Sequence, residues 1–522
     1  MSVLTALARA EAYAAGIAVP VTTVRHVHLS PEPFVLVPLM LAGEAAAPLA
    51  VLAGCARDKP TLLFVPQPRN RDQRFLFLAE LAELMLTYID DKRAHTETVP
   101  ATRNREAWER SLDAPQILVP NSGGIEALRL LGRSARFRSA GGPYPVHPAV
   151  PVLGRYLTWL AEDRAPMPGS AICAAMTDLL SGHWATGQSA LEDQLLAAQL
   201  AWIRPDRVFD AIGIDATGID ADEAAPALSR LSGAEAALLV EDPQRCPPAG
   251  PATDPDFDQR VLGPLLERQL AAAEDPEAQV EVLEALRNAL LSQLQPTWDL
   301  MWLGVDLLAE LPDAAYNPIR WQVDCGRFTN FAQQVDDGAP PQARRDSAVH
   351  AAARLANLEA AQESHQLHRA LDDPLVMAQY RVTGEAFRGE IIAVDQDRQI
   401  TKNKRAWPRP RVLLRTSDPA LVRIGSKVAS PSRINQKKVI VVGLERDGED
   451  LVIELELQDG MGRGAKPEPG SVPEVGELRT YATLLSAETF TPPPFPELEA
   501  TPWTHGGPPP AYVPVAADLD ED

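Results

Sequence analysis

Cysteine is scarce in this chain of 522 residues. Its four cysteines, Cys55, Cys173, Cys246 and Cys325, lie more than 70 residues apart, and no CxxC pair occurs. A structural zinc site and a disulfide framework are therefore not indicated. A reducing, cytoplasmic setting is the expectation for such a chain.

The short motifs of common catalytic sites are also missing. The sequence contains no GxxxxGKS/T, GxSxG or HExxH, so Gly425-Ser426-Lys427 is not a phosphate-binding loop. His26 and His28 alternate but lack a clear third ligand, and we expect neither a metal site nor a cofactor. The absence of such motifs favours a protein without catalytic activity.

A membrane span is not expected either. The most apolar stretch, Phe34–Ala56, is cut by Pro38, Gly43, Pro48 and Gly54. The resulting pieces suit two buried strands joined near Gly43, whereas a span needs about 20 continuous apolar residues. The N-terminus lacks the basic start and the apolar run of a signal peptide. We expect a soluble protein that makes no membrane contact.

Negative charge dominates the composition, with 71 acidic against 49 basic residues and a net charge of −22. Residues 398–438 reverse this trend, because they hold twelve basic side chains and a single acid, Asp418. This segment is near +11, and the rest of the chain sums to about −33. Such a local concentration predicts a surface that meets an anion, and we favour the backbone of a nucleic acid.

Length and hydrophobic patterning predict an α+β multidomain chain. Residues 1–140 read as an α/β segment, and residues 141–373 as a mainly α-helical domain that ends in a long helix, Ala343–Leu371. Residues 375–486 read as the short strands of a small β-barrel of SH3 or OB type. The acidic, Pro-rich residues 487–522 are predicted to be a disordered tail.

The predicted strands are apolar runs bounded by turn-forming residues. In the first segment they are Thr23–Leu29, Phe34–Leu41, Leu49–Gly54, Thr61–Val65 and Gln116–Pro120. In the barrel they are Tyr380–Asp395, Arg411–Thr416, Lys438–Glu445, Leu451–Gln458 and Leu478–Leu485. Asp72 is expected to cap the helix that follows the fourth strand.

Within the basic segment, the loop Arg398–Pro410 places five cations around Trp407. Cations that flank an exposed aromatic ring suit a single-stranded nucleic acid, because phosphates pair with Arg or Lys while a base stacks on the ring. Two other interpretations stay open. In the first, the loop is merely solvated and Trp407 covers the end of the barrel. In the second, the basic strip docks on an acidic surface of the same chain.

On the strand after this loop, alternation predicts that Arg411 and Arg415 point outward while Val412 and Leu414 pack the core. The candidate nucleic-acid contacts are the cations of the segment except Arg398, together with its tryptophan: Lys402, Lys404, Arg405, Trp407, Arg409, Arg411, Arg415, Arg423, Lys427, Arg433, Lys437 and Lys438.

A second candidate anion site combines two strand-to-helix junctions, Val65–Asp72 and Asn121–Gly124. If the two strands are neighbours, free N–H groups at both helix N-termini would meet arginines at one sheet edge. The simpler alternative, a tight turn and solvated arginines, is somewhat favoured. The candidate residues are Arg69, Arg71, Arg74, Ser122, Gly123, Gly124, Arg129 and Arg133.

Three runs, Tyr156–Trp159, His183–Asp193 and Pro251–Asp258, resemble an uncharacterised family of high-GC bacterial proteins. The resemblance extends over most of residues 60–460. It implies a loose association with superfamily 1 helicase partners. It brings no established activity, and it assigns no catalytic residue to this chain.

The sequence therefore favours a non-enzymatic accessory subunit. We expect it to bind DNA or RNA through the basic barrel and to work with a helicase motor or a nuclease, in DNA processing or phage defence. Phe495, Trp503 and Tyr512 of the tail are candidate anchors for a protein partner. The alternatives are a protein-only scaffold that docks on an acidic partner and a metal-dependent nuclease with unrecognised carboxylates.

Overall fold

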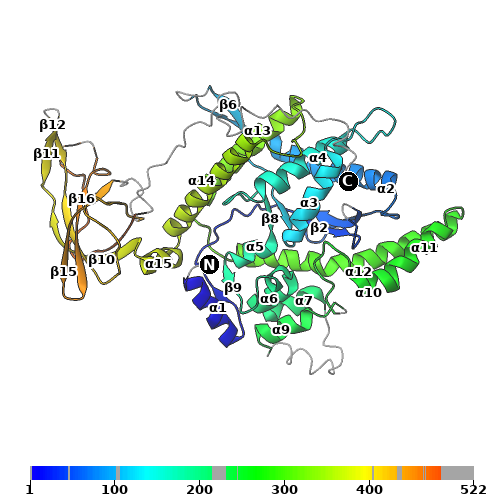
Figure 1. Cartoon of the computed structure of the whole chain (residues 1–522), viewed down its shortest axis with the longest axis horizontal. Coiled ribbons are helices and arrows are strands. Elements are labelled where there is room, and N and C mark those ends of the chain that lie inside the picture. Colours follow the sequence, from blue (N-terminus) through cyan, green and yellow to red (C-terminus); the bar gives the residue numbers. More distant parts are fainter. Residues whose placement is uncertain are drawn as a thin grey trace, which may run out of the picture. The chain divides into compact units, whose positions relative to one another are not determined.

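The computed structural model describes residues 3–44, 47–101, 106–213, 231–243, 245–402, 405–431, 438–462, 464 and 466–483 (Figure 1). The chain divides into two compact units. Thr5–Gln362 form the larger unit, and the described residues from Glu363 onward belong to the smaller one. The tail predicted to be disordered, residues 487–522, lies outside the described residues.

A five-stranded mixed sheet forms the centre of the larger unit. Its strands lie in the order β4-β3-β2-β7-β8 and span Thr61–Phe64, Pro48–Gly54, Phe34–Met40, Ile117–Val119 and Cys173–Ala175. β2, β7 and β8 run parallel, whereas β3 is antiparallel to both of its neighbours. Four of the five strands predicted in the first segment, all except Thr23–Leu29, are thereby confirmed.

Helices cover both faces of this sheet, which explains why its strands are apolar without interruption. Phe34 and Leu36 of β2 point into one core, and Val35 and Val37 point into the other. The first core includes α2 (Arg71–Arg93), α3 (Ser122–Ala135), α4 (Ala149–Trp159) and α13 (Asn317–Asp336). The second includes α5 (Met176–Ser181), α6 (Leu196–Ile203), α7 (Pro205–Ile212), α9 (Gly233–Val240) and α12 (Pro276–Ala309).

The apolar stretch Phe34–Ala56 forms two buried strands, as predicted. β2 and β3 pair as a hairpin, and Gly43 between them takes a left-handed φ of 74°. Glycine adopts this backbone conformation without the steric cost of a Cβ atom. Among the described residues, the search for a helix with the length and apolarity of a membrane span finds none.

Residues 141–373 do not form a core of their own. β8 extends the same sheet as β2 and β7, and α12 packs beneath β2 and β3, so the larger unit crosses the boundary predicted at residue 140. A three-residue strand such as Cys173–Ala175 is too short to stand out from helical surroundings in a sequence. The long helix predicted at Ala343–Leu371 is α14, Ala348–Asp372.

Two local predictions in the larger unit are wrong. Thr23–Leu29 is an irregular segment in which Arg25 forms an isolated β-bridge with Asp313. α2 is capped by Asn70, whose side chain accepts the backbone N–H of Asp72 at 2.9 Å. Asp72 itself lies one residue inside the helix, where its charge still suits the positive helix end.

Shorter elements complete the described chain. They are α1 (Val3–Ala15), the ribbon of β1 (Val19–Pro20) and β9 (Trp184–Ala185), the ribbon of β5 (Thr96–Val99) and β6 (Trp108–Ser111), η1 (Leu160–Arg164), η2 (Glu192–Gln194), α10 (Pro255–Phe257), η3 (Asp258–Leu262) and α11 (Gly263–Ala271).

Six antiparallel strands form a nearly closed barrel in the smaller unit. They lie in the order β14-β15-β16-β13-β10-β17 and span Lys427–Val428, Val439–Asp447, Asp450–Leu457, Arg411–Thr416, Ala386–Asp395 and Leu478–Ala482. Hydrogen bonds of 3.1 and 3.0 Å between Ala429 and Ala482 join the two ends of the sheet. Phe387, Val412 and Ile453 point inward and are fully buried. The predicted small β-barrel is confirmed.

The first predicted barrel strand, Tyr380–Asp395, begins too early. Pro374–Thr383 form a helix, α15, which ends where Gly384 takes a left-handed φ of 82°. Gly389 lies within β10, and a Cβ atom there would be 2.1 Å from the carbonyl oxygen of Arg415 on β13. Glycine therefore lets these two strands approach closely where the barrel bends.

A buried carboxylate joins α13 to the segment that leads into β8. Asp324 accepts hydrogen bonds from the hydroxyl of Ser170 at 2.9 Å and from the backbone N–H of Ala171 at 2.8 Å. Burial raises the pKa of Asp324 from its ordinary 3.8 to about 6, although these two hydrogen bonds favour the ionised form. Asp324 therefore resists ionisation in the folded protein.

The Asp324→Asn variant should unfold with a different pH dependence from the wild type. Because the folded pKa lies above the unfolded pKa, protonation of Asp324 stabilises the fold below about pH 4, and this contribution is lost as the pH rises through 6. The free energy of unfolding of the wild type, relative to the variant, should fall by up to about 3 kcal/mol between those pH values. Urea denaturation followed by tryptophan fluorescence checks this, and a difference that stays constant with pH contradicts it.

Candidate functional site

A two-stranded hairpin, inserted between β10 and β13, carries the predicted aromatic contact. β11 (Gln399–Lys402) pairs antiparallel with β12 (Arg405–Pro408), outside the barrel sheet, and lies at one end of the barrel in Figure 1. The register places Ile400 opposite Trp407. Trp407 is 39% exposed. We call Gln399–Pro408 the hairpin.

The predicted alternation of β13 is confirmed. Val412 and Leu414 are fully buried in the barrel core, whereas Arg411 and Arg415 point away from it. The outward face of β13 lies beside the outward face of β16, because the register places Arg411 opposite Glu456. We call these two outward faces the barrel wall.

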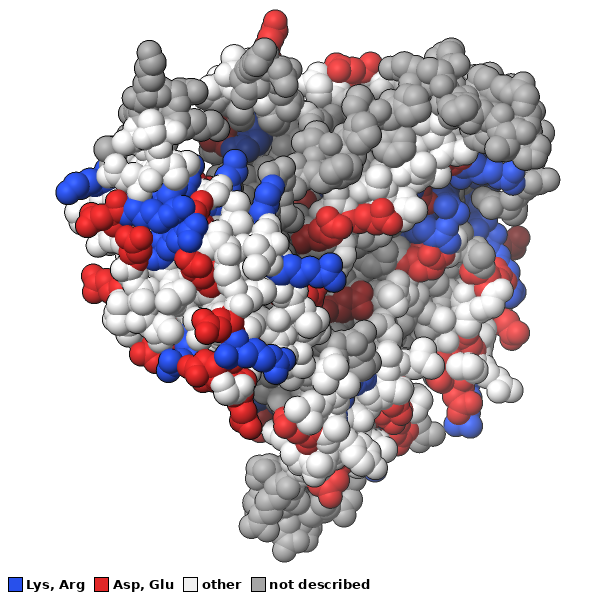
Figure 2. Space-filling model, turned by 60° about the vertical axis from the view of Figure 1, so that its left-hand side comes forward, with Lys and Arg blue, Asp and Glu red and all other residues white. Residues whose placement is uncertain are grey.

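Carboxylates of the same unit pair with the arginines of the barrel wall. Arg411 lies 2.9 Å from Glu454 and 3.4 Å from Glu456, and Glu456 also accepts from Arg398 at 2.6 Å. Arg415 lies 3.2 Å from Asp447. Figure 2 shows the same interspersion on the face that it draws, where blue basic and red acidic side chains lie beside one another. The barrel wall therefore carries mixed charge.

The remaining cations of the basic segment lie at the hairpin and around β14 and β15. Arg423, Lys427 and Lys438 are exposed. The backbone N–H of Lys438 donates to Asp459 Oδ1 at 2.9 Å, so a carboxylate lies beside this lysine. Arg409 donates to the carbonyl oxygen of Pro408 at 2.8 Å. Lys404, Arg433 and Lys437, and the side chains of Lys402 and Arg405, lie outside the described residues.

The second candidate anion site does not form as predicted. Its condition was that the strands before the two junctions, β4 and β7, are neighbours, but β3 and β2 lie between them. Arg69 pairs with Glu44 at 2.5 Å, and Arg71 pairs with Asp72 at 2.9 Å. Arg74 lies in the first turn of α2.

The N-terminus of α3 is already occupied by other parts of the chain. The backbone N–H and the hydroxyl of Ser122 both donate to Gln194 Oε1, at 3.0 and 2.6 Å, and the N–H of Gly124 donates to Asn121 Oδ1. A Cβ atom on Gly123 would lie 2.5 Å from Pro251 Cδ, so Pro251 packs directly against this turn. Arg129 and Arg133 lie farther along α3 and belong to a different pocket.

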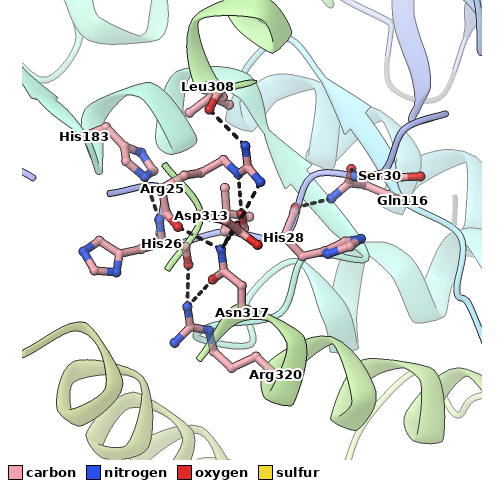
Figure 3. A network of polar contacts seen from close by, with 11 residues as sticks. Arg25, His26, His28, Ser30, Gln116, His183, Leu308, Asp313, Asn317 and Arg320 are labelled. Carbon is pink, nitrogen blue, oxygen red and sulfur yellow. Dashed lines mark hydrogen bonds and ion pairs between the residues drawn. The ribbon is translucent and has the colours of Figure 1, made fainter. Parts of the chain in front are cut away.

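The alternating histidines anchor the irregular segment Thr23–Ser30, which we call the strap (Figure 3). The backbone N–H of His26 donates to His183 Nε2 at 3.0 Å. The His28 ring stacks on Trp321 with 4.0 Å between ring centroids, and burial lowers the pKa of His28. Both positions therefore serve packing. In the part of the chain that the structure describes, no group of His, Cys, Asp and Glu could hold a metal ion.

Asn317 is the buried centre of the polar network that holds the strap (Figure 3). Its Nδ2 donates to the carbonyl oxygens of Arg25 at 2.8 Å and Val27 at 3.1 Å, and to Asp313 Oδ1 at 2.5 Å. Arg320 in turn donates to Asn317 Oδ1. The strap thus replaces strand pairing with side-chain hydrogen bonds that satisfy its backbone carbonyls.

Comparison of the chain with known protein families, curated proteins and solved structures finds no match in any of the three. The resemblance to high-GC bacterial proteins stays a prediction.

Replacement of Asn317 by alanine should destabilise the larger unit by about 2 kcal/mol, because it removes two hydrogen bonds to the strap at about 1 kcal/mol each. The two carbonyls keep their other donors, the N–H of Ala314 for Arg25 and Nε of Arg25 for Val27. Gln322→Ala is the matched control, since Gln322 is an exposed amide on the same helix and its replacement should change stability by less than about 0.5 kcal/mol. Urea denaturation measures both. Equal stability of the two variants would show that the network does not hold the strap.

Proposed function

We propose that the hairpin and the cations near it bind single-stranded nucleic acid, and that the chain is a non-enzymatic accessory subunit. The observation that carries this proposal is Trp407, a partly exposed tryptophan on a short two-stranded hairpin within the basic segment of an acidic chain. An exposed aromatic ring stacks on a base with about 1–3 kcal/mol, and neighbouring cations hold the phosphates.

The ion pairs of the barrel wall reduce the number of cations that are available for the proposed contact with nucleic acid. Arg398, Arg411 and Arg415 already have carboxylate partners, so binding there would have to separate ion pairs. The cations of the hairpin, with Arg423, Lys427 and Lys438, carry the phosphate contacts in this proposal. A contact made by these cations alone releases fewer counterions than one made by all twelve cations of the segment. Its affinity should therefore be modest, and it should fall with added salt.

The rest of the proposed role depends on the resemblance and on composition. A helicase or a nuclease is the proposed partner, in DNA processing or phage defence, and the barrel is proposed to be of SH3 or OB type. A cytoplasmic location is proposed because all four cysteines are free thiols, three of them buried.

Replacement of Trp407 by alanine should weaken binding of a labelled oligothymidylate about tenfold at low salt, because the stacking platform is lost. Trp407→Phe is the control, since it retains an aromatic face and should keep most of the affinity. Fluorescence anisotropy with the full chain measures both. The proposal fails if the wild type does not bind, or if the alanine variant binds as tightly as the wild type.

Replacement of Glu456 by glutamine should strengthen the same binding about three- to tenfold, because it releases Arg398 for phosphate and leaves Arg411 with Glu454 as its one carboxylate partner. Glu449→Gln removes the same charge from the exposed turn between β15 and β16, where the structure gives Glu449 no ion pair among the described residues. The gain should therefore be clearly smaller in the control. An equal gain in both variants would mean that only net charge matters.

A further inference from the structure

A second concentration of arginine lies in the larger unit, away from the basic segment in sequence. An open pocket of about 340 Å³ is lined by four arginines and two carboxylates: Arg129, Arg133, Arg344, Arg354, Glu162 and Asp346. We call it the arginine pocket. All of its lining residues belong to the larger unit, so the inference is independent of the nucleic-acid contact proposed for the hairpin.

Three separate parts of the chain build the arginine pocket. Arg129 and Arg133 lie one turn apart on α3, and Glu162 belongs to η1, which continues α4. Arg344 precedes α14, and Arg354 lies in its second turn. α3 and η1 are neighbours in the first core, whereas the arginines before and within α14 come from at least 180 residues later in the chain.

The internal contacts of these arginines leave many hydrogen-bond donors unused. Each guanidinium has five N–H donors. Arg133 contacts Glu162 through its Nε at 2.7 Å. Arg354 pairs with Asp346 at 3.3 Å and donates to the carbonyl oxygen of Glu162. Arg344 forms no ion pair or hydrogen bond within the described part of the chain, but its guanidinium lies over the Phe137 ring, 5.9 Å from the ring centroid.

The charge of the lining also favours an anion. Four arginines face two carboxylates, which leaves a surplus of positive charge in a chain of net charge −22. The surplus falls to one positive charge when Glu126, the partner of Arg129, is counted with the lining, and the carboxyl of Asp163 also interacts with Arg354. An ion-pair network that served stability alone would not need the unmatched Arg344 at the pocket.

We propose that the arginine pocket binds an anion that carries one or two phosphate groups. Planar guanidinium groups pair with phosphate oxygens through two parallel hydrogen bonds, which a lysine cannot do. The volume of the pocket equals that of about ten water molecules at about 30 Å³ each, and a pyrophosphate group fits into this space. A free oligophosphate and a nucleic-acid backbone offer this same chemistry.

Isothermal titration of the full chain with sodium pyrophosphate, at constant ionic strength, tests the arginine pocket. The wild type should bind, and Arg344→Gln should weaken binding at least tenfold with little loss of stability, because it breaks no ion pair and removes only the contact of Arg344 with the Phe137 ring. Arg344→Lys should fall between the two, since it keeps the charge but not the planar fork. The control is Arg207→Gln, which removes an equal charge from an arginine paired with Glu310 at 2.6 Å elsewhere in the unit; its binding should be unchanged.

A second titration separates the two sources of phosphate. If Arg344→Gln weakens oligothymidylate binding in the Trp407→Ala background and pyrophosphate does not bind, the ligand is a nucleic-acid backbone. If pyrophosphate binds and depends on Arg344, the ligand is a free oligophosphate. The proposal is overturned if neither ligand is sensitive to Arg344, or if Arg207→Gln has the same effect. The failure of the hairpin proposal is recognised separately, by the Trp407 variants alone.

Discussion

The pairing of Glu456 with two arginines determines how much of the barrel's positive charge is left for a ligand. Glu456 accepts from Arg398 and Arg411, and Glu454 adds a second contact to Arg411. The pairs of Arg411 follow from the register of β13 and β16, which places Arg411 opposite Glu456, whereas Arg398 reaches Glu456 from the segment before the hairpin. Cross-strand pairs of opposite charge stabilise a sheet modestly, and here they also remove charge from the ligand-binding surface.

Charge counted along the sequence overstated the basic surface for a physical reason. The segment 398–438 holds one acid, but the acids that neutralise its arginines lie in residues 447–456, beyond its end. Antiparallel pairing brings them together in space. The inward positions were predictable because alternation along Arg411–Thr416 depends only on the strand itself, and Val412 and Leu414 are buried accordingly. The partners of the outward positions depend on strand order, which the sequence does not reveal.

In the larger unit too, features that depend on a local pattern were predictable, and features that depend on distant partners were not. Continuous apolar runs predicted β2, β3, β4 and β7, because strands buried on both faces have no polar face to interrupt them. β8 has three residues, and the strap is held by Asn317 from about 290 residues away, so neither leaves a local pattern. The anion site predicted from two junctions depended on β4 and β7 being neighbours, and the sheet places two strands between them. The arginines of α3 instead face Arg344 and Arg354, which no local motif connects to them.

The central claim is that nucleic acid meets the hairpin and not the barrel wall. Photo-crosslinking of an oligonucleotide that contains 5-iodouracil to the full chain, followed by mass spectrometry of the peptides, tests this claim most directly. The crosslinks are predicted in the peptide that contains Trp407, within residues 399–409. Crosslinks confined to β13 and β16, or the absence of crosslinks from the smaller unit, would contradict it.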